Sequence, residues 1–353
     1  MFSLDKIIRN NVKSLKPYAS ARDEFKGREG IFLDANENPF GSLAGDGMNR
    51  YPDPLQRSVK EKIADWKAIS TEHIFLGNGS DEIIDLLIRA FCEPREHNII
   101  ITPPTYGVYS VYAEINDVVV KKVLLDETFN LNVDQVLDAV NEQTRLIFLC
   151  SPNNPTGNIV PRETVINIAK DFPGLVVVDE AYADFSEQPS MVHLLNDLPN
   201  LFVMQTFSKA WGMAALRLGM GFANPDIVKV LNKIKPPYNI NAITQELALK
   251  AMDRKSEAAD WVQQIILERS DLAQQLRGLD VVKNVYPSEA NFLLIKTTNA
   301  KKIYDYLTGR GIIVRNRSSE PGCAECLRVT VGTKDENIEL IASMKEYSEN
   351  LNP

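Results

Sequence analysis

Residues 201–223 read LFVMQTFSKAWGMAALRLGMGFA. The segment begins with an apolar run that fits a buried strand, and this run ends in Thr206-Phe207-Ser208-Lys209. A second strand-like run, RLGMGF, begins at Arg217. An amine and a hydroxyl at the end of a buried strand are not explained by burial, because charged side chains are rarely buried without a partner. The segment therefore predicts a buried sheet with a functional lysine at its edge.

Short apolar runs alternate with helical patterns from about Glu72 onward. Residues 175–178, Leu-Val-Val-Val, are apolar on both faces, which is typical of strands buried in a mostly parallel sheet. Alternating β and α segments indicate an α/β fold in which helices flank a central sheet. We assign residues 36–265 to this large domain. The more mixed remainder, residues 1–35 and 266–353, is assigned to a smaller α+β domain and an N-terminal segment.

Polar side chains follow three consecutive strand-like runs. They are Ser151-Pro152-Asn153-Asn154-Pro155-Thr156-Gly157, Asp179-Glu180-Ala181-Tyr182 and Thr206-Phe207-Ser208-Lys209. Each has a simple structural explanation, since Asn-Pro-Thr-Gly is a good turn, a strand-end Asp is often a helix N-cap, and a Ser-Lys pair is often solvated. Ligands of open α/β sheets, however, bind beyond the carboxyl ends of the strands. The three segments together predict an amide, a carboxylate with a phenol, and an amine with a hydroxyl at one sheet edge.

The loop Gly77-Asn78-Gly79-Ser80 follows a predicted strand and precedes a helix predicted over 81–91. Small residues let the backbone approach a phosphate, and a helix N-terminus presents free N–H groups. Alternatively, Ser80 only caps the helix. Together with Ser208 and Arg217, the loop would complete a cradle for one phosphate. Because no GxGxxG motif opens a helix here, the loop is not a dinucleotide-binding fingerprint.

The composition limits the classes of partner. The 353 residues include 39 Lys and Arg against 47 Asp and Glu, a formal net charge of −8, which argues against nucleic acid as the main partner. The four cysteines suit a reducing compartment, and the lone CxxC at 323–326 lacks the further ligands that zinc needs, so no metal site is predicted. Neither a secretory signal nor a membrane-spanning apolar run is present. We expect a cytoplasmic protein without a membrane partner.

Three motifs occur in order along the chain: SPNNPTG at 151–157, VVDEAY at 177–182 and SKAxGxxxLRLG at 208–219. Together they resemble the fold-type I aminotransferases, which use pyridoxal 5′-phosphate (PLP), and the resemblance covers most of the chain. It implies the aspartate-aminotransferase fold, in which a large domain with a mostly parallel central sheet carries a smaller α+β domain. It also implies PLP as the cofactor.

The resemblance implies roles for individual side chains. Lys209 would carry PLP as a Schiff base and, once released, would shuttle the proton of the substrate carbon, tasks that suit an amine of lowered pKa. Asp179 would keep the pyridine nitrogen protonated, so that the ring draws electrons from the substrate. Asn154 and Tyr182 would bind the 3′-oxygen of the ring. Tyr106 would stack on the ring, unless it is only a core aromatic.

The other implied cofactor contacts surround the phosphate of PLP. Within one subunit they are Gly79, Ser80, Asp81, Ser208 and Arg217. Tyr51, in the segment RYPDP, would reach the same phosphate from the neighbouring subunit. The resemblance therefore implies a homodimer whose active sites each draw on both chains.

Segments outside these motifs resemble the histidinol-phosphate aminotransferase subgroup. They are KPY (16–18), LDANENPFG (33–41), RYPDP (50–54), IIVRNRS (312–318) and LRVTVGT (327–333). In this subgroup Arg328 would bind the carboxylate of glutamate and the phosphate of histidinol phosphate in turn. Arg315 would be a second anion contact, because guanidinium forks match phosphate oxygens, and Tyr18 and Asn36 would lie near the substrate. The simpler explanation of Arg315 and Arg317 is a solvated charged stretch.

The implied reaction is transamination between L-histidinol phosphate and 2-oxoglutarate, which gives imidazole acetol phosphate and L-glutamate in histidine biosynthesis. Two alternatives share the motifs, namely an aminotransferase for aromatic amino acids and a decarboxylase of threonine phosphate. A non-catalytic PLP-binding regulator would need a DNA-binding domain, and the sequence shows no basic helix-turn-helix segment. An α/β oxidoreductase would need the glycine fingerprint that is missing here.

Overall fold

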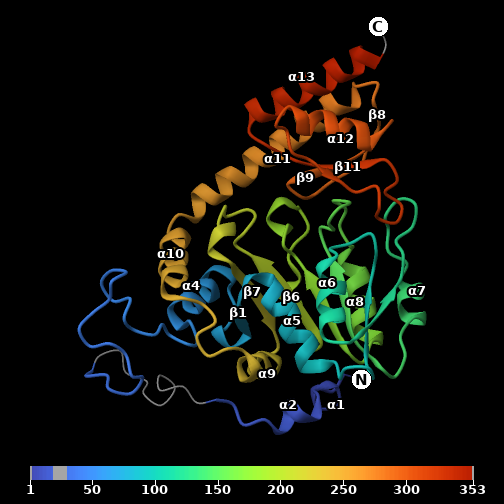
Figure 1. Ribbon diagram of the computed structural model, residues 1–353. Coiled ribbons are helices and arrows are strands. Elements are labelled where there is room, and N and C mark those ends of the chain that lie inside the picture. The colour runs from blue at the N-terminus through green and yellow to red at the C-terminus, as the bar shows by residue number, and fades with distance from the viewer. Residues whose placement is uncertain (1, 19–29, 352–353) are drawn as a thin grey trace.

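The large sheet has seven strands and is mostly parallel. The computed structural model describes residues 2–18 and 30–351 (Figure 1). The strand order is β1-β7-β6-β5-β4-β2-β3. The strands are β1 (Ile74–Asn78), β2 (Asn98–Ile101), β3 (Val119–Lys122), β4 (Thr144–Cys150), β5 (Leu175–Asp179), β6 (Leu201–Thr206) and β7 (Leu218–Ala223). Only the pairs that include β7 are antiparallel within this described sheet, which confirms the predicted α/β architecture.

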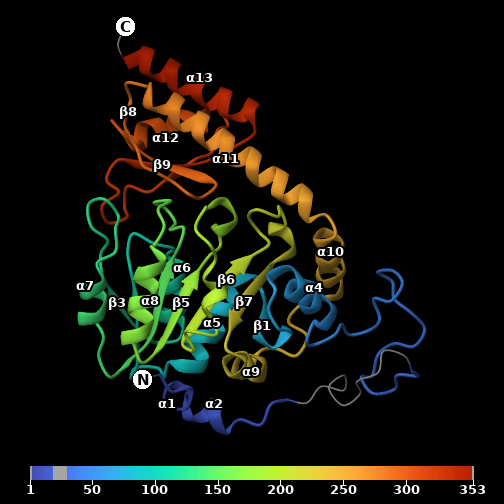
Figure 2. The same ribbon diagram turned by 180° about the vertical axis from the view of Figure 1, so that it is seen from behind.

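Helices cover both faces of this sheet (Figure 2). Because side chains alternate along a strand, β5 directs Val176 and Val178 into one apolar core and Leu175 and Val177 into another. The first core includes side chains of α4 (Arg57–Lys67), α7 (Val133–Asp138), α8 (Arg162–Asp171) and α10 (Ala242–Met252). The second includes side chains of α5 (Gly79–Phe91), α6 (Val108–Ile115) and α9 (Pro225–Ile234). The large sheet is thus held between two packed layers of helices.

A second, smaller sheet lies above the large one in Figure 1. It is antiparallel, with the order β10-β11-β9-β8. Its strands are β8 (Val282–Val285), β9 (Phe292–Thr297), β10 (Arg315–Asn316) and β11 (Cys326–Thr330). Its helices are α11 (Lys255–Arg277), α12 (Ala300–Gly309) and α13 (Lys334–Leu351). A core separate from the two cores of the large sheet includes buried apolar side chains of α11, α12, α13, β8, β9 and β11. Val262 of α11 and Phe292 of β9 instead join a core of the large sheet.

Two short N-terminal helices, α1 (Leu4–Ile7) and α2 (Asn10–Ser14), pack beside the large sheet. Ile7 is buried in the core that contains α5 and α9, and Arg9 forms an ion pair with Glu93 at 3.0 Å. This part of the N-terminal segment therefore packs on the large body and not on the small sheet. The predicted domain boundary after residue 265 falls inside α11, and the division of the chain into domains stays a prediction.

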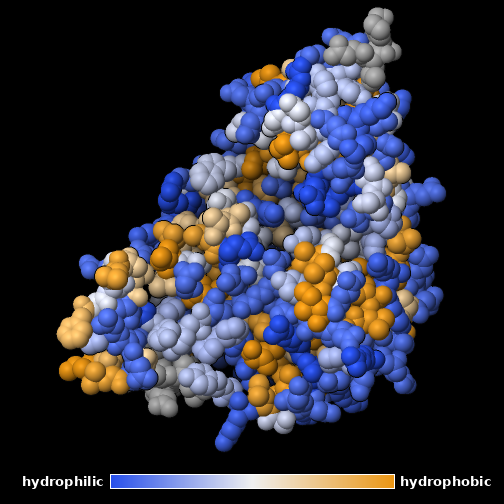
Figure 3. Space-filling model, in the orientation of Figure 1, coloured by the Kyte–Doolittle hydropathy of each residue, from blue (hydrophilic) through white to orange (hydrophobic). Residues whose placement is uncertain are grey.

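Residues 30–56 form an arm without helix or strand, which Figure 1 shows projecting beside α4. The arm exposes several large side chains with apolar surface, and Figure 3 shows orange and tan atoms in this region, at its lower left. The side chains are Ile31, Leu33, Phe40, Leu43 and Tyr51. Several exposed large apolar side chains on one segment are typical of an interaction surface.

Within residues 2–18 and 30–351, no helix is both long and apolar enough to cross a membrane.

Candidate active site

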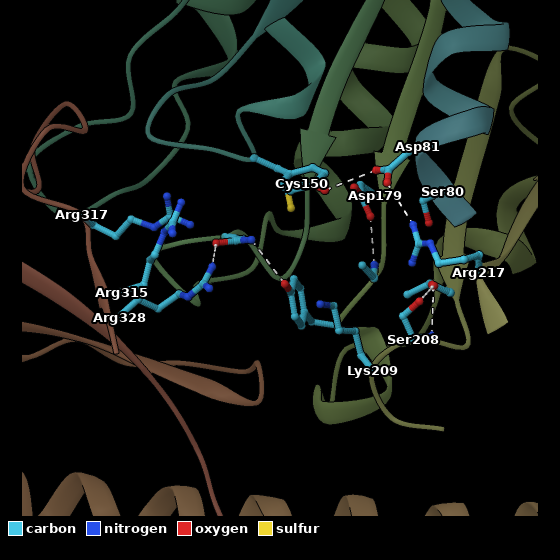
Figure 4. A pocket seen from close by; sticks show the side chains of 15 residues that line it. Ser80, Asp81, Cys150, Asp179, Ser208, Lys209, Arg217, Arg315, Arg317 and Arg328 are labelled. Carbon is cyan, nitrogen blue, oxygen red and sulfur yellow. Dashed lines mark hydrogen bonds and ion pairs between the residues drawn. The ribbon is translucent and has the colours of Figure 1, made fainter. Parts of the chain in front are cut away.

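A cavity of about 370 Å³ lies where the strand ends of the large sheet meet the small sheet (Figure 4). Its volume falls in the range typical of small-molecule sites. Of the predicted site residues, the structure brings to this cavity Ser80, Asp81, Tyr106, Asn154, Asp179, Tyr182, Ser208, Lys209, Arg217, Arg315 and Arg328. Four side chains that were not predicted as site residues also line it, namely Cys150, Ala181, Thr206 and Arg317.

The register of the parallel strands explains why the predicted groups converge. Cys150, the last residue of β4, pairs with Asp179, the last residue of β5. Asp179 in turn pairs with Met204 near the end of β6. The segments that follow these strands therefore leave the sheet at the same edge, as the sequence predicted.

Lys209 projects its amine into the cavity and lies near the ring of Tyr182, with 5.5 Å between Nζ and the ring centroid. Partial burial lowers the pKa of Lys209, and the positive charges of Arg328 and Arg217 lower it further. Asp179 opposes this effect through its negative charge. A larger fraction of this amine is thus unprotonated at neutral pH than of an ordinary surface lysine.

Asp179 is buried and accepts two hydrogen bonds. Its Oδ1 accepts from the backbone N–H of Ala181 at 3.0 Å, and its Oδ2 accepts from the hydroxyl of Tyr109 at 2.6 Å. Burial raises the pKa of Asp179, while both hydrogen bonds counteract the increase by stabilising the carboxylate. Tyr109 was missed by the sequence analysis. It lies on α6, three residues after Tyr106, which precedes that helix, so its place in the same segment PTYGVY was the available signal.

Asn154 connects the two sides of the cavity. Its side-chain oxygen accepts a hydrogen bond from Arg328 Nη1 at 2.6 Å, and its amide Nδ2 donates to Tyr182 Oη at 3.3 Å. Burial raises the pKa of Tyr182, so its phenol remains protonated at neutral pH. Asn154 and Tyr182 are therefore ordered polar groups in the middle of the pocket.

The N-terminus of α5 forms one end of the cavity. The helix begins at Gly79, earlier than the predicted residue 81, and its N-cap Asn78 makes no side-chain capping hydrogen bond. Ser80 is therefore not the N-cap, and it lines the cavity. Gly79 has a φ of +74°, and a Cβ added to it would lie 2.6 Å from Arg217 Nη2. The glycine thus permits both the left-handed backbone and the close approach of the guanidinium.

Hydroxyl and guanidinium groups surround this helix N-terminus. Arg217 Nη2 forms an ion pair with Asp81 Oδ2 at 3.1 Å, and Thr206 Oγ1 donates to Ser208 Oγ at 3.0 Å. The backbone N–H of Gly79 donates to the carbonyl of Arg217 at 2.7 Å, which joins α5 to the start of β7. N–H groups, hydroxyls and one guanidinium at one place make a suitable site for a phosphate group.

Three arginines, Arg315, Arg317 and Arg328, converge on the opposite end of the cavity (Figure 4). Antiparallel pairing of β10 with β11 places Arg315 opposite Arg328. Among the described residues, the Nε atoms of Arg317 and Arg328 are buried without a hydrogen-bond partner. The ion pair that the structure records for this group joins Arg317 to Glu320 at 3.8 Å. Arg317 is half-buried, so the alternative of a solvated charged stretch does not hold for it.

Three predicted residues lie outside this cavity in their own chain. Tyr18 is exposed, and Asn36 and Tyr51 line a separate pocket beside Tyr238, on whose ring Tyr51 stacks at 4.5 Å. Their predicted part in cofactor or substrate binding stays a prediction.

Comparisons with known proteins agree with this geometry. Residues 28–344 match the family described as aminotransferase class I and II. The chain is 56% identical over 346 residues to a histidinol-phosphate aminotransferase of Cytophaga hutchinsonii, a match that covers 98% of this chain and 99% of the relative.

Solved structures show the same fold. A histidinol-phosphate aminotransferase from Clostridium acetobutylicum is 25% identical, with a TM-score of 0.80 and coverage of 86% of this chain and 92% of that chain. One from Sinorhizobium meliloti, solved in complex with pyridoxal 5′-phosphate, is 24% identical, with a TM-score of 0.79 and coverage of 90% of both chains. The chain therefore belongs to the class I and II aminotransferases.

Proposed function

We propose that this aminotransferase transfers the amino group between L-histidinol phosphate and 2-oxoglutarate, giving imidazole acetol phosphate and L-glutamate. The observation that carries the proposal is one cavity with a lysine amine and a buried carboxylate at one end and three arginines at the other. The names of relatives that match almost the whole chain support this substrate. The same evidence favours it over an aromatic amino acid or threonine phosphate.

The residues present fit PLP as the cofactor. The N-terminus of α5 with Ser208 and Arg217 would hold the phosphate. Glycine at position 79 lets the Arg217 guanidinium come close to this helix N-terminus, because a Cβ there would collide with Arg217 Nη2. Tyr106 would stack on the pyridine ring, and Asn154 with Tyr182 would bind the ring's oxygen. When bound, PLP supplies an aldehyde for amines and a ring that withdraws electrons from the substrate carbon.

Lys209 and Asp179 would carry out the acid–base work. The lowered pKa of Lys209 favours an unprotonated amine, which could accept a proton from the substrate carbon and donate it to the C4′ carbon of the cofactor. Asp179, held by its two hydrogen bonds, would place a negative charge beside the ring nitrogen and keep that nitrogen protonated. The two residues thus have separate tasks at one end of the cavity.

The arginine end of the cavity would bind an anionic group of each substrate in turn. The buried Nε atoms of Arg317 and Arg328 lack a hydrogen-bond partner, which is costly in free energy, and an anionic ligand would remove this cost. Glutamate presents a carboxylate, whereas histidinol phosphate presents a phosphate that carries up to two negative charges. Three guanidinium groups in one place suit the phosphate especially, because their forks match its oxygen atoms.

The test is a set of single half-reactions with the purified PLP-loaded enzyme. Mixing with histidinol phosphate should rapidly remove the visible absorbance of bound PLP, and glutamate should do the same, because both amines would be donors. Phenylalanine and threonine phosphate are the comparison substrates. Rapid loss of absorbance with phenylalanine and none with histidinol phosphate would reject the proposed substrate. Release of carbon dioxide from threonine phosphate would favour the decarboxylase.

We further propose a homodimer in which the arm of each chain completes the partner's cavity. The arm exposes large apolar side chains, with Phe40 at 97% exposed and Ile31 at 92%, which is unfavourable in water. Asn36 and Tyr51 lie on this arm, away from the cavity of their own chain. A second copy would cover the apolar surface and receive both residues. A cytoplasmic location is also proposed, since all four cysteines are free and buried.

Two impaired variants should therefore complement each other at limiting PLP. Tyr51→Ala should lower activity at limiting PLP, and Lys209→Ala should remove it. Co-expression of both gives hybrid dimers that each contain one intact site, so activity should reach about one quarter of wild type if the chains pair at random as a two-fold dimer. Size-exclusion chromatography with light scattering checks the dimer. If Tyr51 served its own chain, the mixture would show no gain over the average of the two variants.

A further inference from the structure

The phenol of Tyr109 lies directly behind the carboxylate of Asp179. Tyr109 is completely buried, and its Oη donates to Asp179 Oδ2 at 2.6 Å. Its ring stacks on Phe148, with 4.9 Å between centroids, and meets the edge of Tyr106 at 5.6 Å. These ring contacts fix the phenol on two sides, so its hydroxyl stays beside Asp179 and also beside the thiol of Cys150, with which it interacts.

The hydrogen bond affects the charge of a buried carboxylate. Charged groups that face Asp179 come from several elements: Asp81 on α5 opposes its ionisation, and Lys209 after β6 favours it. Other titratable groups that interact with Asp179 are Tyr106 before α6, Tyr109 on α6, Cys150 on β4 and Tyr182 after β5. Burial raises the pKa of Tyr109 and of Cys150, so both keep their protons at neutral pH. Tyr109 thus remains a hydrogen-bond donor, and it stabilises the ionised form of Asp179.

We propose that Tyr109 is a positioning residue for Asp179, whose hydroxyl holds the carboxylate in place and in its ionised form toward the cavity. Its role in catalysis rests on the proposed function, because only a cofactor with a ring nitrogen in this cavity makes the charge of Asp179 useful. Tyr109 lies behind Asp179 and is not among the residues that line the cavity. It acts through the carboxylate and not on the substrate.

Tyr109→Phe is the informative variant, because it removes the hydroxyl and retains the ring that stacks on Phe148. Loss of a hydrogen bond to a charged group should raise the pKa of Asp179 by about one unit, a tenfold change in proton affinity. The acid limb of the kcat profile should then move to higher pH by about one unit. The second readout is the Tm of the cofactor-free protein as a function of pH.

The sign of the Tm effect follows from proton linkage. Burial raises the folded-state pKa of Asp179 above its unfolded value, so its ionisation costs stability as the pH rises toward the folded pKa. In the variant the folded-state pKa of Asp179 is higher still, so the loss of stability on ionising Asp179 continues up to a higher pH than in wild type. The Tm difference between wild type and Tyr109→Phe should therefore open between the two folded pKa values and stay constant above them.

Two controls separate this role from simple packing. In an Asp179→Asn background, which cannot ionise, Tyr109→Phe should give a Tm difference that does not change with pH. Tyr112→Phe removes a hydroxyl from the same helix without a hydrogen bond to Asp179, and should leave the acid limb in place. A pH-independent Tm difference in the otherwise wild-type protein would reject the inference. Because the cofactor-free readout involves no substrate, it remains decisive even if the half-reactions reject histidinol phosphate.

Discussion

Lys209→Ala should abolish transamination, with kcat reduced by roughly 10⁴-fold, the upper end of what one positioned acid–base group contributes. The amine of Lys209 has a lowered pKa and projects into the cavity that also contains Asp179 and Tyr182. No other lysine is among the described residues that line this cavity. Removal of this side chain therefore removes both the covalent attachment of PLP and the group that moves the substrate proton.

The measurement is peptide mass spectrometry after borohydride reduction of the PLP-loaded protein, together with the assay. Wild type should carry the mass of reduced PLP on the peptide that contains Lys209, and the variant should carry none. Lys60→Met is the matched control, because burial lowers the pKa of Lys60 to about 8 but its amine lies in a different pocket. This control should keep both label and activity.

The control distinguishes a defined site from general lysine reactivity. PLP reacts with many unprotonated amines, so a low pKa alone would favour labelling at Lys60 as well. If Lys60 carried the reduced cofactor and Lys209→Ala retained activity, the assignment of Lys209 would be wrong. Loss of label in both variants would indicate unfolding, which circular dichroism of the two proteins resolves.

The fold and one end of the site could be predicted because both depend on local sequence. Apolar runs such as residues 175–178 identify buried strands, and parallel strands end at the same edge of a sheet. The groups that follow β4, β5 and β6 therefore had to converge. The start of α5 was misplaced because Gly79 begins the helix with a positive φ, a geometry that propensity does not reveal.

The other parts of the site depend on contacts between distant segments. Tyr109 reaches Asp179 on β5 because its ring packs on Phe148 of β4, and nothing in the sequence near Tyr109 identifies its partner. Arg317 occupies a segment that is polar enough to be solvated, yet packing of the small sheet turns it toward the cavity. The arm with Tyr51 would require a second chain. Long-range packing and assembly therefore limit prediction more than local structure does.

Arg328→Ala should weaken both half-reactions, because both substrates would place an anion at the same guanidinium. Truncating one partner of a buried hydrogen-bonded charge pair costs about 2–5 kcal/mol, or roughly 30-fold to several thousand-fold in kcat/KM. Arg328 is held for this contact by β11, by its bond to Asn154 Oδ1 at 2.6 Å and by the ring of Phe292 at 5.3 Å. Single-turnover titrations with glutamate and with histidinol phosphate measure the two effects separately.

Arg317→Gln is the matched control for this prediction, since it removes a guanidinium from the same end of the cavity and leaves Arg328 in place. A phosphate has more oxygen atoms and more charge to share among guanidinium groups than a carboxylate has. We therefore expect Arg317→Gln to weaken histidinol phosphate more than glutamate, whereas Arg328→Ala weakens both. Unchanged glutamate kinetics in Arg328→Ala would contradict a shared anion site. It would mean that the carboxylate of glutamate and the phosphate of histidinol phosphate bind at different arginines.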